Sequence, residues 1–286
     1  MNLIAYLKTT AKQLLGHQQA RKPRLKAQRP KPASYEEQIY AAVVGEGDLC
    51  FDIGANRGDV AIFLARLAGS SGKIIAFEPA WPVYESLCAN IQSDIYRKSP
   101  ILTVPYGLAA TESELSIQVP NGNYGMGSMA QAERWREAQS GATLDAFRAL
   151  TNLPTPDFMK IDVEGAEWLV LQGAAGMFNA GVRPLMLIEI FAPWEQAFGY
   201  QPWTPLAWLL EQGYRFLFAC PNGLVEHLPS SDKPFPPDYI QAYNIVAFVP
   251  EQHAGRIKNL ESLRAGHRPK LFPMFPPPIP NVIDKA

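Results

Sequence analysis

Two short segments of this chain constrain its fold more than any others. The first is an apolar stretch, Leu49–Ile53, that runs into a turn containing Gly54 and Gly58 and then into a helical pattern. The second is another apolar stretch, Lys73–Phe77, that ends in the acid Glu78. Glycines let backbone approach a ligand closely, and an acid after the next strand accepts hydrogen bonds from ribose hydroxyls. Together the segments predict a nucleoside site in an open α/β sheet.

The spacing of the turn indicates which nucleoside it would bind. A dinucleotide site needs Gly-x-Gly-x-x-Gly, whereas this turn offers only Gly54 and Gly58 and carries an acid on either side, Asp52 and Asp59. Two carboxylates would repel a pyrophosphate and suit a ligand with a cationic end. S-adenosylmethionine has an ammonium group, a sulfonium group and a ribose diol. It is therefore the cofactor that we expect.

In these residues and in two further segments, the chain resembles the FkbM-type family of S-adenosylmethionine-dependent methyltransferases. The segments that carry the resemblance are 51–58 (FDIGANRG), 76–79 (AFEP), 143–145 (TLD) and 157–167 (DFMKIDVEGAE). The last segment is the most specific, and the likeness covers roughly residues 35 to 250. It implies a Rossmann-like class I methyltransferase: a mostly parallel seven-stranded sheet with an antiparallel edge pair and helices on both faces.

The hydrophobic pattern alone also predicts an α/β fold, because short apolar runs alternate with helical periodicity. Two late runs without a helix between them indicate an antiparallel pair, and 221–223 is expected to be the turn that joins them. The expected strands are 49–53, 73–77, 102–106, 158–163, 185–190, 214–219 and 244–249, with 114–119 as a candidate for an added strand. The expected helices are 35–44, 60–67, 81–91, 144–149, 166–172 and 204–212.

Ligands of such sheets bind at the carboxyl ends of the strands. We expect Glu78 to accept both ribose hydroxyls, because an ionised carboxylate only accepts. Asp52 with the backbone of Ile53 and Gly54 would hold the methionine end, and Asn56 is either a turn residue or a cofactor contact. The expected cofactor-binding residues are Asp52, Ile53, Gly54, Asn56, Gly58, Glu78, Leu108 and Ala109, the last two beside the adenine.

A second group of charged residues follows the expected strand 158–163. Asp162 and Glu164 are the catalytic candidates, since they share a face with Lys160 and lie where a substrate hydroxyl would be presented. The alternative is structural: an ion pair with Lys160, or caps for the next helix. A magnesium site built from Asp162, Glu164 and Glu189 is a third interpretation, and it is not favoured because no ligand signature is present.

Composition narrows the class of protein. The 286 residues carry a net charge of −1, which gives no reason to expect nucleic-acid binding, and the three cysteines lack metal-ligand spacing. Scattered cysteines of this kind fit small apolar residues in the reducing cytoplasm. We expect three parts: a basic amphipathic arm at 1–33, a methyltransferase domain at 34–252 and a proline-rich tail at 253–286. The arm is either a docked helix with a basic linker or a helix resting on an anionic membrane surface.

The function expected from the family resemblance is O-methylation of a hydroxyl, foremost that of a sugar in a glycan or glycosylated metabolite. Two alternatives stay open: a polyketide or other secondary-metabolite hydroxyl as the acceptor, and a non-catalytic module that binds S-adenosylmethionine. The partner is then a small-molecule or glycan acceptor and not a nucleic acid. The non-catalytic module would keep Asp52 and Glu78 but would not need Asp162.

Overall fold

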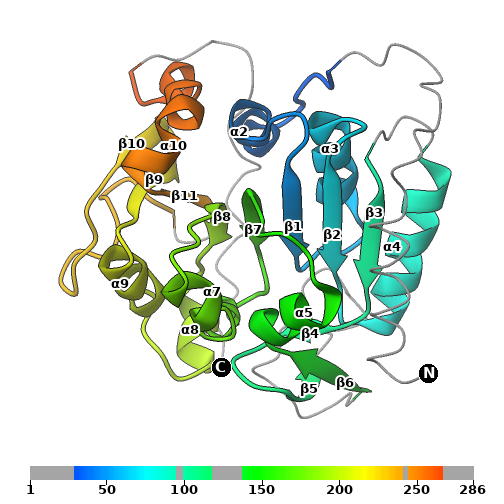
Figure 1. The fold of residues 1–286 in the computed structure, drawn as a ribbon. Helices are drawn as coiled ribbons and strands as arrows, with labels where there is room; N and C mark the ends of the chain where they lie inside the picture. The colour runs from blue at the N-terminus through cyan, green and yellow to red at the C-terminus, as the bar shows by residue number, and fades with distance from the viewer. Residues whose placement is uncertain (1–28, 95–98, 118–136, 241–243, 267–286) are drawn as a thin grey trace, which may run out of the picture.

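Figure 1 shows the computed structural model of the chain, which describes residues 29–94, 99–117, 137–240 and 244–266. A large sheet runs through the middle of the molecule. Its strands are β1 (Leu49–Ile53), β2 (Lys73–Phe77), β3 (Ile101–Val104), β7 (Phe158–Ile161), β8 (Leu185–Glu189), β9 (Arg215–Cys220), β10 (Gly223–Glu226) and β11 (Asn244–Phe248). They lie in the order β10-β9-β11-β8-β7-β1-β2-β3.

The directions of these strands confirm a mostly parallel sheet with antiparallel strands at one edge. Strands β3, β2, β1, β7 and β8 are parallel to one another, whereas β11 is antiparallel to both β8 and β9. The prediction of seven strands was wrong by one, because β10 adds an eighth outside β9. The expected turn at 221–223 therefore joins β9 to β10 and not to β11. Strand β10 has only four residues and ends in the exposed Glu226, so it shows no apolar run.

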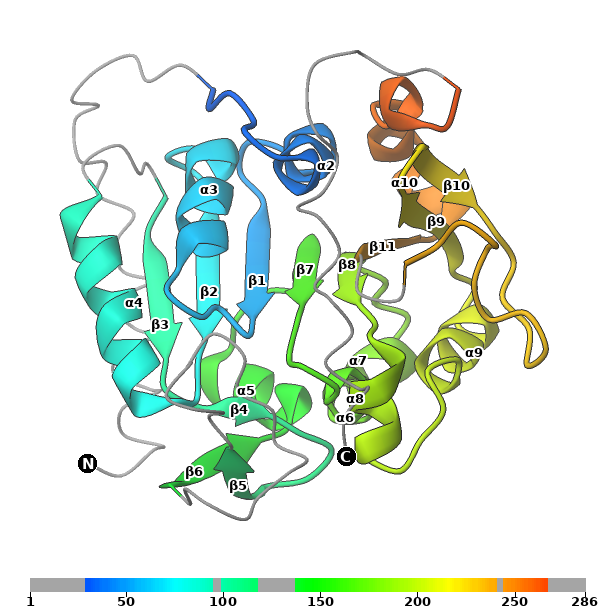
Figure 2. The same ribbon diagram turned by 180° about the vertical axis from the view of Figure 1, so that it is seen from behind.

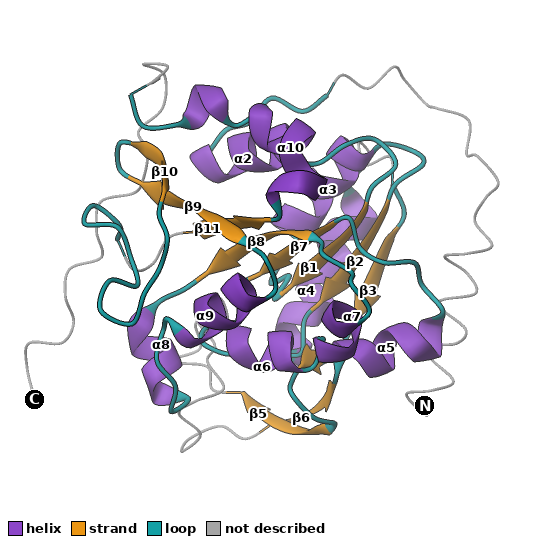
Figure 3. Cartoon of the chain, turned by 60° about the vertical axis from the view of Figure 1, so that its left-hand side comes forward, coloured by secondary structure: helices purple, strands orange, loops and turns teal. Residues whose placement is uncertain are grey.

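Helices cover both faces of the sheet, as expected. They are α2 (Tyr35–Val43), α3 (Asp59–Ala68), α4 (Trp81–Ser93), α5 (Leu144–Thr151), α6 (Glu167–Gln172), α7 (Ala175–Asn179), α8 (Ala192–Ala197), α9 (Thr204–Glu211) and α10 (Pro250–Lys258). Figure 3 shows α2, α3 and α10 on one side of the sheet and α5, α6, α7 and α9 on the other. Each side has its own buried apolar cluster. Because the central strands are buried on both faces, they are mostly apolar, and Asp52 in β1 and Lys160 in β7 are the buried charged exceptions.

A second sheet of three strands lies beyond the carboxyl ends of the parallel strands (Figure 2). Its strands are β4 (Gly107–Leu108), β5 (Ser113–Ile117) and β6 (Glu137–Ala142). The candidate added strand at 114–119 corresponds to β5, which pairs with β6 and not with the large sheet. The glycine-rich segment 121–129, whose composition predicts a loop, lies outside the described residues.

The ends of the expected domain can be followed only in part. Residues 1–28 of the arm and 267–286 of the tail lie outside the described residues. The expected boundary at 252 falls inside α10, and the buried Leu260 and Leu263 continue the core beyond it. Across the part of the chain that the structure describes, no helix combines the length and the apolar character needed to cross a membrane.

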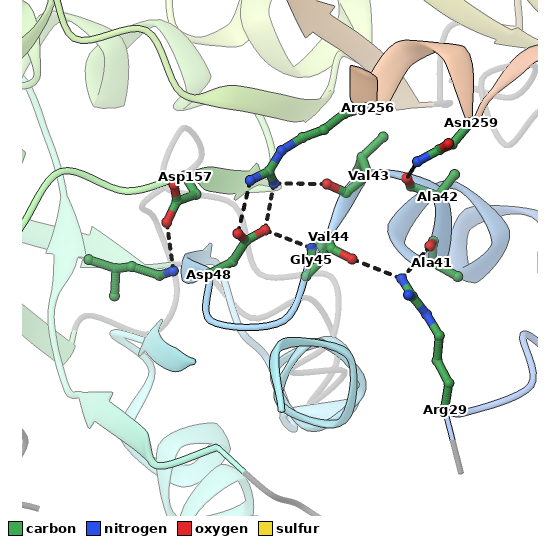
Figure 4. Close-up of polar contacts among 11 residues, drawn as sticks. Arg29, Ala41, Ala42, Val43, Val44, Gly45, Asp48, Asp157, Arg256 and Asn259 are labelled. Carbon is green, nitrogen blue, oxygen red and sulfur yellow. Dashed lines mark hydrogen bonds and ion pairs between the residues drawn. The ribbon is translucent and has the colours of Figure 1, made fainter. Parts of the chain in front are cut away.

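A network of polar contacts joins α10 to the start of β1 (Figure 4). The Arg256 guanidinium donates to both carboxylate oxygens of Asp48 and to the Val43 carbonyl at the end of α2. Asp48 is 6% exposed, and it also accepts from the Gly45 N–H at 2.8 Å. A two-pronged pair of this kind, in which the carboxylate is buried, is stronger than a surface ion pair. The network holds α2 and α10 together over one face of the sheet.

We expect Arg256→Ala to lower the free energy of unfolding by about 3 kcal/mol, because it leaves the Asp48 carboxylate buried without its partner. The matched control is Arg264→Ala. Arg264 pairs with Glu226 and Glu261, whose side chains are 51% and 57% exposed, so the loss there should stay within about 1 kcal/mol. Urea unfolding of the three proteins at equal m-values measures the difference. Equal losses in the two variants would show that the Arg256 network is no stronger than a surface pair.

Candidate active site

The turn after β1 is fastened to the two neighbouring strands. The N–H groups of Gly54 and Ala55 both donate to the Phe77 carbonyl at the end of β2, at 3.0 and 2.8 Å. On the other side, the Asp162 N–H donates to the Ile53 carbonyl at 3.0 Å. The turn, the end of β2 and the end of β7 therefore form one rigid rim, as the sequence predicted from the carboxyl ends of parallel strands.

Gly54 is required by the packing of the chain itself. Its φ is +86°, and a Cβ at this position would lie 1.8 Å from the Asp162 carbonyl oxygen. Gly58 also has a positive φ, +90°, where it starts α3, and a Cβ there would meet the Leu87 side chain at 2.5 Å. Asn56 adopts the left-handed conformation as well, with φ of +48°. This conformation accounts for Asn56 as a turn residue, and its contact with a cofactor stays a prediction.

Glu78 is buried against the turn and points its carboxylate at backbone donors. One oxygen accepts from the Asn56 N–H at 2.9 Å and the other accepts from the Ala80 N–H at 2.8 Å. Burial raises the pKa of Glu78 to about 7, although both amide hydrogen bonds act to lower it. Each oxygen of an ionised carboxylate can accept about two hydrogen bonds, so each keeps one lone pair for a ribose hydroxyl. The site therefore fits the diol of an adenosine moiety.

A buried lysine lies at the end of β7. Lys160 is 2% exposed and lies in register with Asp52 of β1. Its ammonium group is 2.8 Å from an Asp162 oxygen and 3.6 Å from Glu36 Oε1. Glu189, at the end of β8, also acts on this amine and shares a hydrogen bond with Asp162. The Lys160 ammonium group thus interacts with carboxyl groups from four parts of the chain: α2, β1, β8 and the segment just after β7.

The two carboxyl groups beside the lysine have opposite protonation preferences. Burial alone would raise the pKa of Asp162, but the Lys160 charge and the hydrogen bonds from Lys160 and Glu189 outweigh it and hold this pKa below its usual value. Burial and the Asp162 charge raise the pKa of Glu189. A hydrogen bond between two carboxyl groups requires one proton between them, and these pKa directions favour Glu189 as its donor. Among the described residues, no group of three or more His, Cys, Asp and Glu side chains is placed to hold a metal ion, so the structure adds no support to the magnesium interpretation.

Asp52 is almost completely enclosed beneath the turn. It is 1% exposed, and its Oδ2 has no hydrogen-bond partner among the described residues. Burial raises its pKa to about 7, while the charge of Lys160 and the Ala61 N–H act to lower it. Its contact with the methionine end stays a prediction, since what the structure shows is that the Lys160 charge acts on this carboxylate.

Glu164 lies on the rim two residues beyond Asp162, where the charges of both Asp162 and Glu78 act on it. Its φ is +52°, a conformation that a non-glycine residue adopts only at some cost, and such residues are concentrated at functional sites. Burial raises its pKa to about 8, helped by the negative charges of Asp162, Glu167 and Glu78. Gly165, the next residue, has φ of +104° and packs against the Trp194 backbone. The backbone of this segment is therefore tightly constrained.

Two further buried acids accept hydrogen bonds from the backbone of the loops near the rim. Glu167 accepts from the Val163 N–H at 3.0 Å, and Glu195 accepts from the Phe191 N–H at 3.2 Å. Each thus closes the loop that follows a strand, β7 in one case and β8 in the other. Burial raises the pKa of Glu167 to about 8 and that of Glu195 to about 7. The backbone bond of Glu167 fits a structural role at the start of α6.

Leu108 and Ala109 lie in and just after β4, and they are 2% and 4% exposed. The Ala109 N–H donates to the Ala142 carbonyl of the second sheet at 3.0 Å. Neither side chain offers a polar group, and their place beside the adenine stays a prediction.

Sequence reasoning missed Glu36 and Tyr40, which reach the site from α2. The Tyr40 hydroxyl donates to Glu36 Oε1, the oxygen that faces Lys160. The only signal was Lys160 itself, because a lysine in a buried strand requires carboxylates from elsewhere. That signal could not identify α2 as their source.

The order of the strands and the site at their carboxyl ends define the class of protein. A parallel sheet that ends in antiparallel strands, with a glycine turn after β1 and an acid after β2, is the fold of class I methyltransferases, here with one additional strand. The sequence profile of the FkbM methyltransferase domain matches residues 52–216, more than half of the chain. The chain belongs to this family.

Several solved structures are similar to the chain at low identity. An FkbM methyltransferase from Methylobacillus flagellatus is 14% identical with a TM-score of 0.44, over 73% of this chain and 47% of that one. An O-methyltransferase from Thermotoga maritima is 17% identical with a TM-score of 0.40, over 77% and 67%. Fibrillarin from Aeropyrum pernix with bound S-adenosylmethionine is 16% identical with a TM-score of 0.39, over 79% and 84%. No curated protein matches the chain.

We expect Gly54→Ala to destabilise the protein by several kcal/mol and to abolish cofactor binding, because the new methyl group would collide with the Asp162 carbonyl. The matched control is Gly213→Ala. Gly213 has almost the same φ, +89°, but open space where a Cβ would lie, so only the conformational cost of about 1 to 2 kcal/mol applies. Thermal unfolding of both variants measures the difference. Similar losses would mean that the clash relaxes and that only φ matters.

Proposed function

We propose that this FkbM-family protein is an S-adenosylmethionine-dependent O-methyltransferase that acts on a hydroxyl group, foremost that of a sugar in a glycan or glycosylated metabolite. The observation that carries this proposal is the pair of acids just beyond β7. Asp162 and Glu164 lie two residues apart on the rim, yet their environments move their pKa values in opposite directions. Such a separation gives two carboxyl groups different tasks in one site.

The residues that would hold the methyl donor are those around the turn. Glu78 would accept from the ribose hydroxyls, and the backbone at Ile53 and Gly54 would line the methionine end. The bound donor would supply a methyl group on a positively charged sulfur. The carboxyl groups of the rim suit that charge, since each ionised one lowers the energy of a cation beside it.

The acceptor hydroxyl needs orientation and a place for its proton. We assign orientation to Asp162, whose carboxylate stays ionised beside Lys160 and can accept from the hydroxyl. We assign the proton to Glu164, because a base works best when its pKa lies near the working pH. Alignment of the two reactants supplies the larger part of the acceleration in such a displacement.

The choice of a sugar rests on the family, which also covers polyketide hydroxyls. A non-catalytic binding module remains the alternative from another class. The constrained backbone at Glu164 favours the enzyme. A module that only binds the nucleoside would not require an acid in the left-handed conformation just beyond β7.

We expect Glu78→Ala to weaken the binding of S-adenosylhomocysteine by about 10- to 100-fold, since hydrogen bonds to a charged group contribute about 1.5 to 3 kcal/mol. Isothermal titration measures this affinity. The matched control is Glu85→Ala, which removes the same charge from an exposed position on the neighbouring helix α4 and should leave the affinity unchanged. If the folded wild type binds no S-adenosylhomocysteine, the proposal fails at its first step.

We expect the rate of methyl transfer to rise with pH through about 8, because Glu164 must lose its proton before it can accept another. Below that pH the raised pKa keeps Glu164 protonated, and above it the carboxylate is available. Glu164→Gln should lower kcat by about 100-fold or more and flatten this limb of the profile. The measurement is kcat/KM against pH with a responsive glycan acceptor. A limb near pH 8 that persists in Glu164→Gln would assign the titration to another group.

A further inference from the structure

Helix α2 precedes the segment that matches the family profile, which begins at residue 52. Its first turn nevertheless reaches the rim. Glu36 Oε1 lies 3.6 Å from the Lys160 ammonium and accepts a hydrogen bond from the hydroxyl of Tyr40, one turn further along the same helix. Tyr40 is 1% exposed, so this hydroxyl is fixed inside the core. Glu36 is thus held in place by its own helix.

The exposure of the three charged side chains shows how they are layered. Glu36 and Asp162 are each 35% exposed, whereas the lysine side chain between them is 3% exposed. The ammonium group is therefore buried with a carboxylate on either side, and both carboxylates reach the surface at the rim. A buried ammonium that lost one of these partners would move toward the other or toward water, because an unpaired buried charge is costly.

We propose that α2 is a functional part of the methyl-transfer site, and that Glu36 and Lys160 are positioning residues that hold the Asp162 carboxylate toward the acceptor. This inference rests on the proposed function for its catalytic consequence, but its structural content can be tested separately. Glu36 acts through Lys160, and Lys160 acts on Asp162 directly at 2.8 Å.

The surroundings of Asp162 explain why the lysine is needed. The other described groups that interact with Asp162 electrostatically are acids or a tyrosine: Asp52 on β1, Tyr40 on α2, Glu78 after β2, Glu164 and Glu167 beyond β7, and Glu189 on β8. Without the ammonium group, Asp162 would face this acidic set alone and its pKa would rise. A protonated Asp162 could no longer accept from a hydroxyl on both oxygens.

The test compares Glu36→Ala and Lys160→Gln with Asn259→Ala. Asn259 donates to the Ala42 carbonyl at the far end of α2 (Figure 4), so this control loosens the same helix without touching the ion pairs. Two readouts need no turnover: the hydrogen exchange of the Lys160 ammonium protons by ¹⁵N NMR, and the titration of the Asp162 carboxyl carbon by ¹³C NMR. The third readout is kcat and KM for methyl transfer.

We expect Lys160→Gln to raise the pKa of Asp162 by about one unit or more. Glu36→Ala should accelerate exchange at the Lys160 ammonium group and lower kcat by about tenfold, with little change in KM for the donor. Lys160→Arg should restore part of the activity, and it covers the case in which Lys160→Gln does not fold. Asn259→Ala should change none of the three readouts.

Two results would overturn the inference. The first is an unchanged Asp162 pKa in Lys160→Gln. If Lys160→Gln does not fold, the equivalent result is a Lys160→Arg variant whose kcat is no higher than that of Lys160→Ala. The other is a Glu36→Ala variant whose ammonium exchange and kcat match those of Asn259→Ala, which would make α2 a scaffold only. If the NMR readouts change as expected but no acceptor is methylated by the wild type, the positioning network stands and the proposed function fails.

Discussion

One buried ammonium group organises the functional end of this molecule. An amine that is 2% exposed requires counter-charges, and Lys160 obtains them from Asp162 on its own segment and from Glu36 on α2. The ion pair between Glu36 and Lys160 links α2 to β7, in addition to the apolar face of α2 and the contacts with α10. The backbone of Asp162 also bonds to Ile53 and lies directly against Gly54, so the residue that pairs with the lysine also contacts the glycine turn. Helix α2, the lysine and the turn are therefore connected through Asp162.

The sequence predicted the central strands well, for a physical reason. Strands β1 and β2 have the predicted bounds, because strands buried on both faces are mostly apolar and end here at a glycine or an acid. The same reasoning failed for β10 and for the second sheet. Strand β10 has four residues beside a tight turn, and β4 has two, so neither is long enough to show a period. Their pairing comes from tertiary contacts that a local pattern does not contain.

Some residues of the candidate site could be placed from the sequence and others could not, for the same reason. Glu78 and Gly54 were predictable because each lies at a fixed place relative to a strand end, and parallel strands bring those ends together. The place of Glu36 was not, because it lies 124 residues from Lys160 and nothing in a helical pattern states which strand end it will meet. Asp52 illustrates a third case: its position along β1 was correct, and it is 1% exposed because every residue of this strand is buried between helices on both faces of the sheet.

The distribution of charge matters more here than its total. The whole chain is nearly neutral, yet the described rim brings together Asp52, Glu78, Asp162, Glu164 and Glu189 with a single lysine. Such a set cannot be fully ionised at once, so burial and repulsion keep some members protonated while Lys160 keeps Asp162 charged. A ligand that brings a positive charge relieves the repulsion, whereas a phosphate would add to it. The charge of the rim therefore suits a cationic ligand better than an anionic one.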